Sequence, residues 1–268
     1  MKVLGTGLVG AYLTIHVALF FLQERLLFFP STQVAATPRD EGLAFEPFSI
    51  PSTDGAQISG WYIPSPNARG VVLYHHGNAG NIGGRLGPAK HLHAQNLDVV
   101  MFDYRGYGDS TGTPSEPGLL ADSRAVYEWL VKEKSVAPDR LVLWGRSLGG
   151  AVAIATASER PCAGLVVESS FTSITDMATL QYPWLLGTRW LVRHPFDSGQ
   201  RIERVPAPTL LAHGDDDGLI PVSHGHRLHE ISGSTRPLVA LQGGHNGTGL
   251  TGPTHAATVD AFVRDVLP

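Results

Sequence analysis

The stretch LVLWGRSLGGAVAIATA, residues Leu141–Ala157, decides the fold of this chain. It begins as a short apolar run, typical of a strand buried on both faces, and it continues after Gly145 as a small-residue pattern typical of a helix. The turn between them matches G-x-S-x-G in the strand–turn–helix context that this motif requires. So sharp a turn strains the backbone of Ser147 and exposes its hydroxyl at the end of the strand. We therefore expect Ser147 to be a nucleophile.

Outward from this stretch, apolar runs and helical patterns alternate along the chain. A hairpin around Asp54–Gly55 predicts two strands, and six further apolar runs predict one strand each. These strands lie within 45–64 and at 71–77, 98–106, 141–144, 165–167, 207–214 and 236–244. Helices are predicted over 115–134, with Ser115 as the N-cap, from 148 onward and over 254–267. The alternation predicts an α/β fold, a mostly parallel eight-stranded sheet with helices on both faces.

The composition is that of an ordinary folded protein, and it argues against nucleic-acid binding, an intramolecular disulfide and a metal site. Of 268 residues, 43% are hydrophobic, and 20 basic against 24 acidic residues give a net charge of −4. Without a basic run, no nucleic-acid partner is expected. Cys162 is the only cysteine, which excludes an intramolecular disulfide and a cysteine zinc cluster. The paired His91 and His93 have no matching carboxylates, so no metal site is predicted.

The N-terminal residues differ from the rest of the chain. Residues 3–22 contain no acidic side chain, lysine or arginine, and as a helix they are about long enough to cross a hydrocarbon layer of ~30 Å. We expect residues 1–28 to form a single-pass membrane anchor that precedes a domain at 29–268. Lys2 lies before the apolar run and the charges after it cancel, which favours a domain on the non-cytoplasmic side.

Two other interpretations of the N-terminus are weighed against the anchor. A cleaved signal peptide would end near the small residues 34–36, although the apolar run is longer than a typical signal core. The pattern G-x-G-x-x-G at 5–10 matches a dinucleotide fingerprint, but no strand precedes it, so we do not interpret it as a nucleotide site. No cofactor is predicted.

A serine nucleophile requires a base, and the base requires an acid that orients it. Both types of residue follow later predicted strands, in the order Ser, Asp, His. His245 follows the last strand, and two glycines precede it, so its imidazole can reach back over the sheet. Asp215, Asp216 and Asp217 follow the strand before it. Because ligands bind at the carboxyl ends of parallel strands, we expect these groups to meet Ser147.

Motifs along nearly the whole chain carry a resemblance to a known family. In chain order they are ERLLFFPS, YHHGNAGN, DYRGYGDS, GRSLGG, HGDDDGLIP and GGHN. On these motifs the chain resembles the α/β-hydrolase fold family, and within it the membrane-anchored serine hydrolases. That branch includes protein depalmitoylases and lysophospholipases.

The resemblance implies a role for several further residues. In the family pattern the acid is the fourth residue after the histidine of HGDDDGLIP, which is Asp217. The two aspartates before it remain rivals, as does Glu168, because some relatives in this fold take the acid from the earlier strand. The family likeness also points to the backbone amides of Asn78 and Leu148 as the oxyanion hole that holds the developing negative charge.

Residues 171–205 are expected to form a short cap over the strand ends. Three aromatic residues in it, Tyr182, Trp184 and Trp190, either line an acyl pocket or hold the cap to the body of the domain.

Together these residues predict a serine hydrolase that cleaves carboxylic ester or thioester bonds through an acyl-enzyme. Ser147 attacks the carbonyl of a small-molecule or lipid acyl ester, His245 takes the proton and Asp217 supports the imidazole. An acyltransferase or a peptidase on the same triad is one alternative. A non-catalytic, membrane-tethered binding module is the other.

Overall fold

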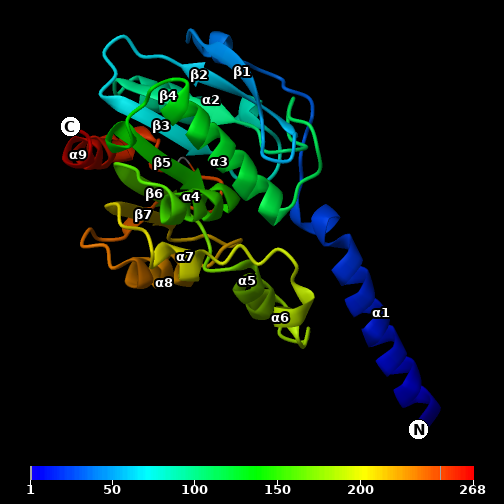
Figure 1. The fold of residues 1–268 in the computed structure, drawn as a ribbon. Helices are drawn as coiled ribbons and strands as arrows, with labels where there is room; N and C mark the ends of the chain where they lie inside the picture. Colours follow the sequence, from blue (N-terminus) through cyan, green and yellow to red (C-terminus); the bar gives the residue numbers. More distant parts are fainter. Residues whose placement is uncertain (1, 248) are drawn as a thin grey trace.

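A computed structural model describes residues 2–247 and 249–268, and it describes side chains from residue 10 onward except at 248. In this part of the chain the strands are β1 (Glu46–Pro51), β2 (Gln57–Ile63), β3 (Gly70–His75), β4 (Leu97–Phe102), β5 (Leu141–Arg146), β6 (Gly164–Glu168), β7 (Thr209–Gly214) and β8 (Val239–Leu241). They form one eight-stranded sheet in the order β1-β2-β4-β3-β5-β6-β7-β8 (Figure 1). The pairs β1–β2 and β2–β4 are antiparallel and the others are parallel. The predicted fold class is confirmed.

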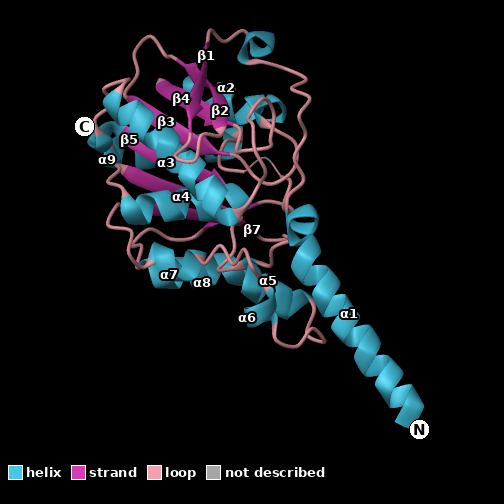
Figure 2. Ribbon diagram, turned by 45° about the vertical axis from the view of Figure 1, so that its right-hand side comes forward, coloured by secondary structure: helices cyan, strands magenta, loops and turns pink. Residues whose placement is uncertain are grey.

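Helices connect and cover these strands (Figure 2). They are α1 (Lys2–Leu27), α2 (Leu86–His93), α3 (Glu116–Lys132), α4 (Leu148–Glu159), α5 (Ile174–Gln181), α6 (Thr188–Leu191), α7 (Ser198–Ile202), α8 (Val222–Ser232) and α9 (Ala256–Val266). The predicted cap of α3 is present, because the Ser115 hydroxyl accepts a hydrogen bond from the amide of Gly118 at 3.2 Å. The sequence patterns above do not predict α2 and α8.

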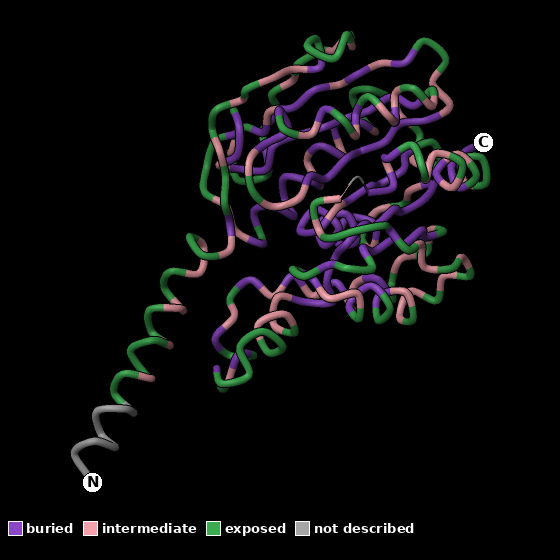
Figure 3. The backbone as a smooth tube through the Cα atoms, turned by 180° about the vertical axis from the view of Figure 1, so that it is seen from behind, coloured by how far each residue is buried: buried purple, intermediate pink, exposed green. Residues whose placement is uncertain are grey.

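The sheet separates two hydrophobic cores. All six residues of β3 are buried. Val71 and Leu73 belong to the core that contains the apolar residues of α3 and α4, whereas Val72 and Tyr74 belong to the core that contains those of α2 and α9. Alternate side chains of a strand point to opposite faces, so this central strand carries hydrophobic side chains on both faces from Val71 to Tyr74. Figure 3 shows the buried strands at the centre of the molecule.

The predicted membrane anchor is wrong. Within the described residues, no helix combines the length and the apolar character that crossing a membrane requires. Polar side chains recur along the described part of α1, among them Thr14, His16 and Gln23, and they lower the mean hydropathy of this segment. The predicted placement of the domain on the non-cytoplasmic side fails with the anchor, and the side chain of Lys2, on which that orientation relied, lies outside the described residues.

Instead, α1 lies beside α5 and α6, at the edge of the 171–205 segment (Figures 1 and 2). His16 is 3.0 Å through Nε2 from the carbonyl oxygen of Leu186. The Gln23 side-chain amide donates to the carbonyl of Leu191 at 2.8 Å. His16 and Gln23 of α1 thus bind main-chain groups of the 171–205 segment.

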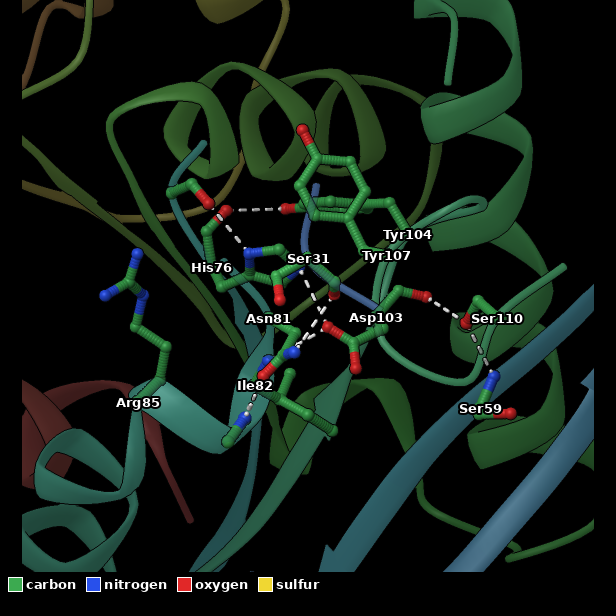
Figure 4. A network of polar contacts seen from close by, with 12 residues as sticks. Ser31, Ser59, His76, Asn81, Ile82, Arg85, Asp103, Tyr104, Tyr107 and Ser110 are labelled. Carbon is green, nitrogen blue, oxygen red and sulfur yellow. Dashed lines mark hydrogen bonds and ion pairs between the residues drawn. The ribbon is translucent and has the colours of Figure 1, made fainter. Parts of the chain in front are cut away.

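A buried polar network joins the loops after β3 and β4 (Figure 4). Asp103 accepts a hydrogen bond from the amide of Ile82 at 2.9 Å, and the same carboxylate oxygen lies 3.5 Å from Nε2 of His76. The Tyr104 hydroxyl donates to the carbonyl of His76 at 3.0 Å. Burial raises the pKa of Asp103 to about 7 and lowers the pKa of His76 to about 3. His76 is therefore neutral at neutral pH.

The turn between β5 and α4 has no room for a side chain at Gly149. A Cβ there would lie 2.1 Å from the carbonyl oxygen of His75, which belongs to the backbone and cannot rotate away. We expect Gly149→Ala to lower the free energy of unfolding by about 3 kcal/mol or more in urea denaturation. Gly87→Ala in α2 is the matched control, because a Cβ there meets nothing within 4 Å. It should stabilise the protein by about 0.5–1 kcal/mol, and equal losses in both variants would contradict the close approach.

Asp103 should make the stability depend on pH. Its pKa is raised in the folded protein, so the folded state holds a proton that the unfolded state releases between about pH 4 and pH 7. Stability that is present below pH 4 is therefore lost as the pH rises through this window. Asp103→Asn removes this loss. Between about pH 4 and pH 7, the free energy of unfolding of the wild type should therefore decrease relative to that of the variant by on the order of 4 kcal/mol. Because both proteins keep His76, urea denaturation at a series of pH values isolates the contribution of Asp103. A constant difference would mean that Asp103 titrates normally.

Candidate active site

The backbone of Ser147 lies in a strained conformation. Its φ of 55° and ψ of −122° fall outside the regions that non-glycine residues favour. Neighbouring groups hold it there, because its amide donates to the carbonyl of Glu168 at 2.8 Å and its carbonyl accepts from the hydroxyl of Ser170 at 2.9 Å. The predicted sharp turn between β5 and α4 is present, and it places the Ser147 side chain at the carboxyl end of β5.

Hydrogen bonds connect Ser147, His245 and Asp217. Nε2 of His245 lies 3.0 Å from Oγ of Ser147, and Nδ1 of His245 lies 2.7 Å from Oδ2 of Asp217. The Asp217 side chain is fully buried, and its other oxygen accepts from the amides of Leu219 and Ile220 at 2.9 and 2.8 Å. In the tautomer whose proton is on Nδ1, the imidazole donates this proton to Asp217, and the lone pair of Nε2 faces the serine hydroxyl. This arrangement suits removal of the serine proton.

The rival acids lie elsewhere. Asp215 and Asp216 are exposed, and Asp215 accepts a hydrogen bond from the amide of Gly243 at 3.1 Å. Glu168 is buried at the end of β6, where it accepts from the amide of Leu250 at 2.7 Å and from the indole of Trp144. Asp217 is the aspartate of the three that contacts His245.

Arg146, next to Ser147 in sequence, binds the loop that carries His245. Its guanidinium donates to the carbonyls of His245 and Gly247 at 2.6 and 2.7 Å. Burial raises the pKa of Glu168, and the positive charge of Arg146 opposes this shift. A Cβ at Gly249 would lie 2.2 Å from Glu168, so the loop approaches this carboxyl closely only because residue 249 is glycine. Arg146 and Glu168 therefore fix the backbone on both sides of the loop.

The two predicted oxyanion residues lie on segments that pack against each other. Leu148 is the first residue of α4, where a helix leaves amides without intrahelical partners. Asn78 lies in the loop after β3, and in that loop a Cβ at Gly77 would lie 3.5 Å from Cβ of Ser147. The loop after β3 thus lies against the nucleophile turn, as an oxyanion hole requires.

The side chain of Asn78 binds the chain just after α1. Its oxygen accepts from the hydroxyl of Tyr107 at 2.8 Å and from the amide of Phe29 at 3.2 Å, and its nitrogen donates to the carbonyl of Leu27 at 2.5 Å. The predicted boundary between residues 28 and 29 would cut through these contacts. The division of the chain into these two parts stays a prediction.

Two of the three predicted pocket residues line a common groove. Tyr182 and Trp184 belong to the wall of a groove of about 440 Å³ between α1 and the 171–205 segment. Trp190 is 83% exposed and lies outside the described lining. The described residues contain no group of three or more His, Cys, Asp or Glu side chains that would hold a metal ion.

The local sequence patterns do not reveal the roles of Arg146, Ser170 and the segment after α1. The only signal for Arg146 is its charge, because a charged residue at the end of a buried strand requires partners. Residues 24–31, ERLLFFPS, stood among the family motifs, but nothing in them shows a contact with a loop about fifty residues away. Ser170 carries no signal beyond its place after a strand.

Known proteins are similar to this chain in sequence and in fold. Residues 66–200 match the family described as "Serine aminopeptidase, S33". The chain is 40% identical over 227 residues to the uncharacterized protein Rv2307c of Mycobacterium tuberculosis (strain H37Rv), covering 84% of this chain and 80% of that protein. It is 32% identical over 273 residues to the "Alpha/beta hydrolase domain-containing protein WAV2" of Arabidopsis thaliana, covering 92% and 87%.

Among solved structures, the esterase Pf2001 of Pyrococcus furiosus has the same fold. It superposes with a TM-score of 0.75 at 20% identity, covering 90% of this chain and 100% of the esterase chain. None of these names bears on the predicted likeness to depalmitoylases and lysophospholipases, which stays a prediction. The family match over half of the chain and the relatives above 30% identity along most of it lead to one conclusion: this chain belongs to the serine aminopeptidase S33 family and is an α/β hydrolase.

Proposed function

We propose that this protein is a serine hydrolase that cleaves carboxylic ester or thioester bonds, with Ser147 as nucleophile, His245 as base and Asp217 as the acid that orients it. The hydrogen bonds that join these three side chains, at 3.0 and 2.7 Å, carry the proposal. The esterase with the same fold is consistent with it, although at 20% identity that likeness concerns the fold alone.

The reaction proceeds in two half-reactions. As Oγ of Ser147 bonds to the acyl carbon, its proton passes to Nε2 of His245, and the carbonyl oxygen takes up negative charge beside the amides of Asn78 and Leu148. His245 then gives this proton to the leaving alcohol or thiol, whose bond to the acyl carbon breaks. Water repeats the sequence on the acyl-enzyme. The products are a carboxylic acid and an alcohol or thiol, and Ser147 regains its proton.

A peptidase on the same triad is the second candidate, because the family description names an aminopeptidase. An aminopeptidase requires an anionic group that binds the α-ammonium of its substrate. The described lining of the groove beside the site contains no carboxylate. We therefore favour an ester or thioester.

Loss of either the nucleophile or the base should abolish turnover. We expect Ser147→Ala and His245→Ala each to lower kcat on p-nitrophenyl butyrate by about four to six orders of magnitude, and the double variant to be little worse, because the groups act as a unit. A fluorophosphonate probe should label the wild type at Ser147. Near-normal turnover of Ser147→Ala would end the proposal, and cleavage of aminoacyl nitroanilides in preference to esters would favour the peptidase.

The acid is tested by an amide replacement. In Asp217→Asn the side-chain nitrogen would face Nδ1 of His245 and favour the tautomer with its proton on Nε2, which cannot take the serine proton. We expect kcat to fall about 10⁴-fold. Asp216→Asn is the matched control at an exposed position and should stay within about twofold of the wild type. If Asp217→Asn lowered kcat only slightly and Glu168→Gln nearly abolished turnover, the acid would be Glu168 at the end of β6.

A further inference from the structure

The groove between α1 and the 171–205 segment has the size and lining of a small-molecule site. Its volume is about 440 Å³, within the range of ~300–1,000 Å³ typical of ligand pockets. Leu19 and Leu26 of α1 form part of one wall, and Ala178 of α5 with Trp184 and Leu185 forms part of the other. Among the described residues that line it, none carries a charge.

Hydrogen bonds connect the two walls of the groove, α1 and the 171–205 segment. The hydroxyl of Tyr12 accepts from the amide of Leu186 at 2.8 Å and donates to the carbonyl of Trp184 at 3.1 Å. Further along the helix, Gln23 donates to the carbonyl of Leu191 at 2.8 Å. His16 and Glu24 of α1 also contact this segment, at the carbonyl of Leu186 and at the side chains of Arg193 and His194. Apart from Gln23 and Tyr182, the described lining between these contacts is apolar.

One end of the groove lies beside the candidate active site. Leu27 lines the groove, and its carbonyl accepts the hydrogen bond from the side chain of Asn78. Ile174, at the start of α5, lines it as well. The end of the groove at Leu27 is therefore one hydrogen bond away from the side chain of Asn78, whose backbone amide is one of the two proposed oxyanion donors.

We propose that this groove binds the aliphatic chain of an acyl ester, and that the enzyme prefers medium- and long-chain fatty acyl substrates. The inference rests on the proposed function, because it places the acyl carbonyl at Ser147. From Ile15 to Leu27 the helix rises by about 18 Å, so the apolar wall is long enough for an extended chain. Each methylene that leaves water for this wall should strengthen binding by about fourfold.

A chain-length series tests the preference. With p-nitrophenyl butyrate, octanoate and laurate as substrates, kcat/KM should rise along the series by about tenfold or more. The short ester hardly reaches the groove, so its Ser147-dependent hydrolysis reports on the proposed function alone. If butyrate is cleaved as fast as laurate, the groove proposal fails while the proposed function stands. If no ester is cleaved and no fluorophosphonate label appears, the proposed function fails.

Two tryptophan substitutions on α5 separate the groove from its surroundings. Ala178→Trp fills the groove and should lower the ratio of laurate to butyrate kcat/KM by about tenfold or more. Leu180→Trp is the matched control, because Leu180 is 55% exposed on the same helix and lies outside the described lining. It should leave the ratio unchanged. Equal effects of the two substitutions would overturn the proposal.

A binding measurement needs no turnover and keeps the proposal testable if a variant folds poorly. Ser147→Ala protein titrated with lauric acid brominated along its chain should lose tryptophan fluorescence, because bromine would lie against Trp184. The same titration of Ser147→Ala/Trp184→Phe should show much less quenching. Quenching that is identical in both proteins would overturn the proposal. So would a dimer in sedimentation that Ala178→Trp dissociates without a change in chain-length preference, because the groove would then bind a second copy of the chain.

Discussion

The strained turn at Ser147 is the constraint on which the rest of the site depends. A positive φ at a residue with a side chain costs about 1–3 kcal/mol, and the surrounding backbone has to hold it. At the end of β6, the carbonyl of Glu168 accepts a hydrogen bond from the Ser147 amide. Gly149 has no side chain, so the turn can pack closely against the carbonyl of His75. The same turn also places Leu148, the next residue, at the start of α4. The proposed nucleophile and one proposed oxyanion amide are therefore placed by one local conformation.

Two neighbouring residues of that turn serve different parts of the site. Ser147 faces the imidazole of His245, while Arg146 binds the main chain of the histidine loop. Glu168 lies buried below this loop and binds it at Leu250. A carboxyl with these partners does not reach the imidazole, which leaves the acid position to Asp217. The assignment by family likeness and the geometry thus agree for a physical reason.

Local patterns predicted the sheet well, because each buried strand is an apolar run that ends where a turn begins, as Val71–Gly77 shows. They did not distinguish Asp217 from Asp215 and Asp216. The backbone conformation of the loop decides which of three adjacent aspartate side chains points to the histidine, and a local sequence pattern does not give that conformation. They failed at α1, because the hydropathy of a segment does not include its partners. His16 and Gln23 are polar residues within this helix, and they bind the carbonyls of Leu186 and Leu191, some 170 residues later in the chain.

The contacts of Asn78 explain how a helix so far from the sheet bears on the chemistry. Its side-chain oxygen and nitrogen bind Tyr107, Phe29 and Leu27, so the side chain is fixed by two loops and by the last turn of α1. A donor aimed at developing charge is effective only if its position is set before the reaction. The same last turn borders the apolar groove. The proposed acyl chain along α1 and the proposed oxyanion amide of Asn78 would therefore both be positioned through the contact between Asn78 and Leu27.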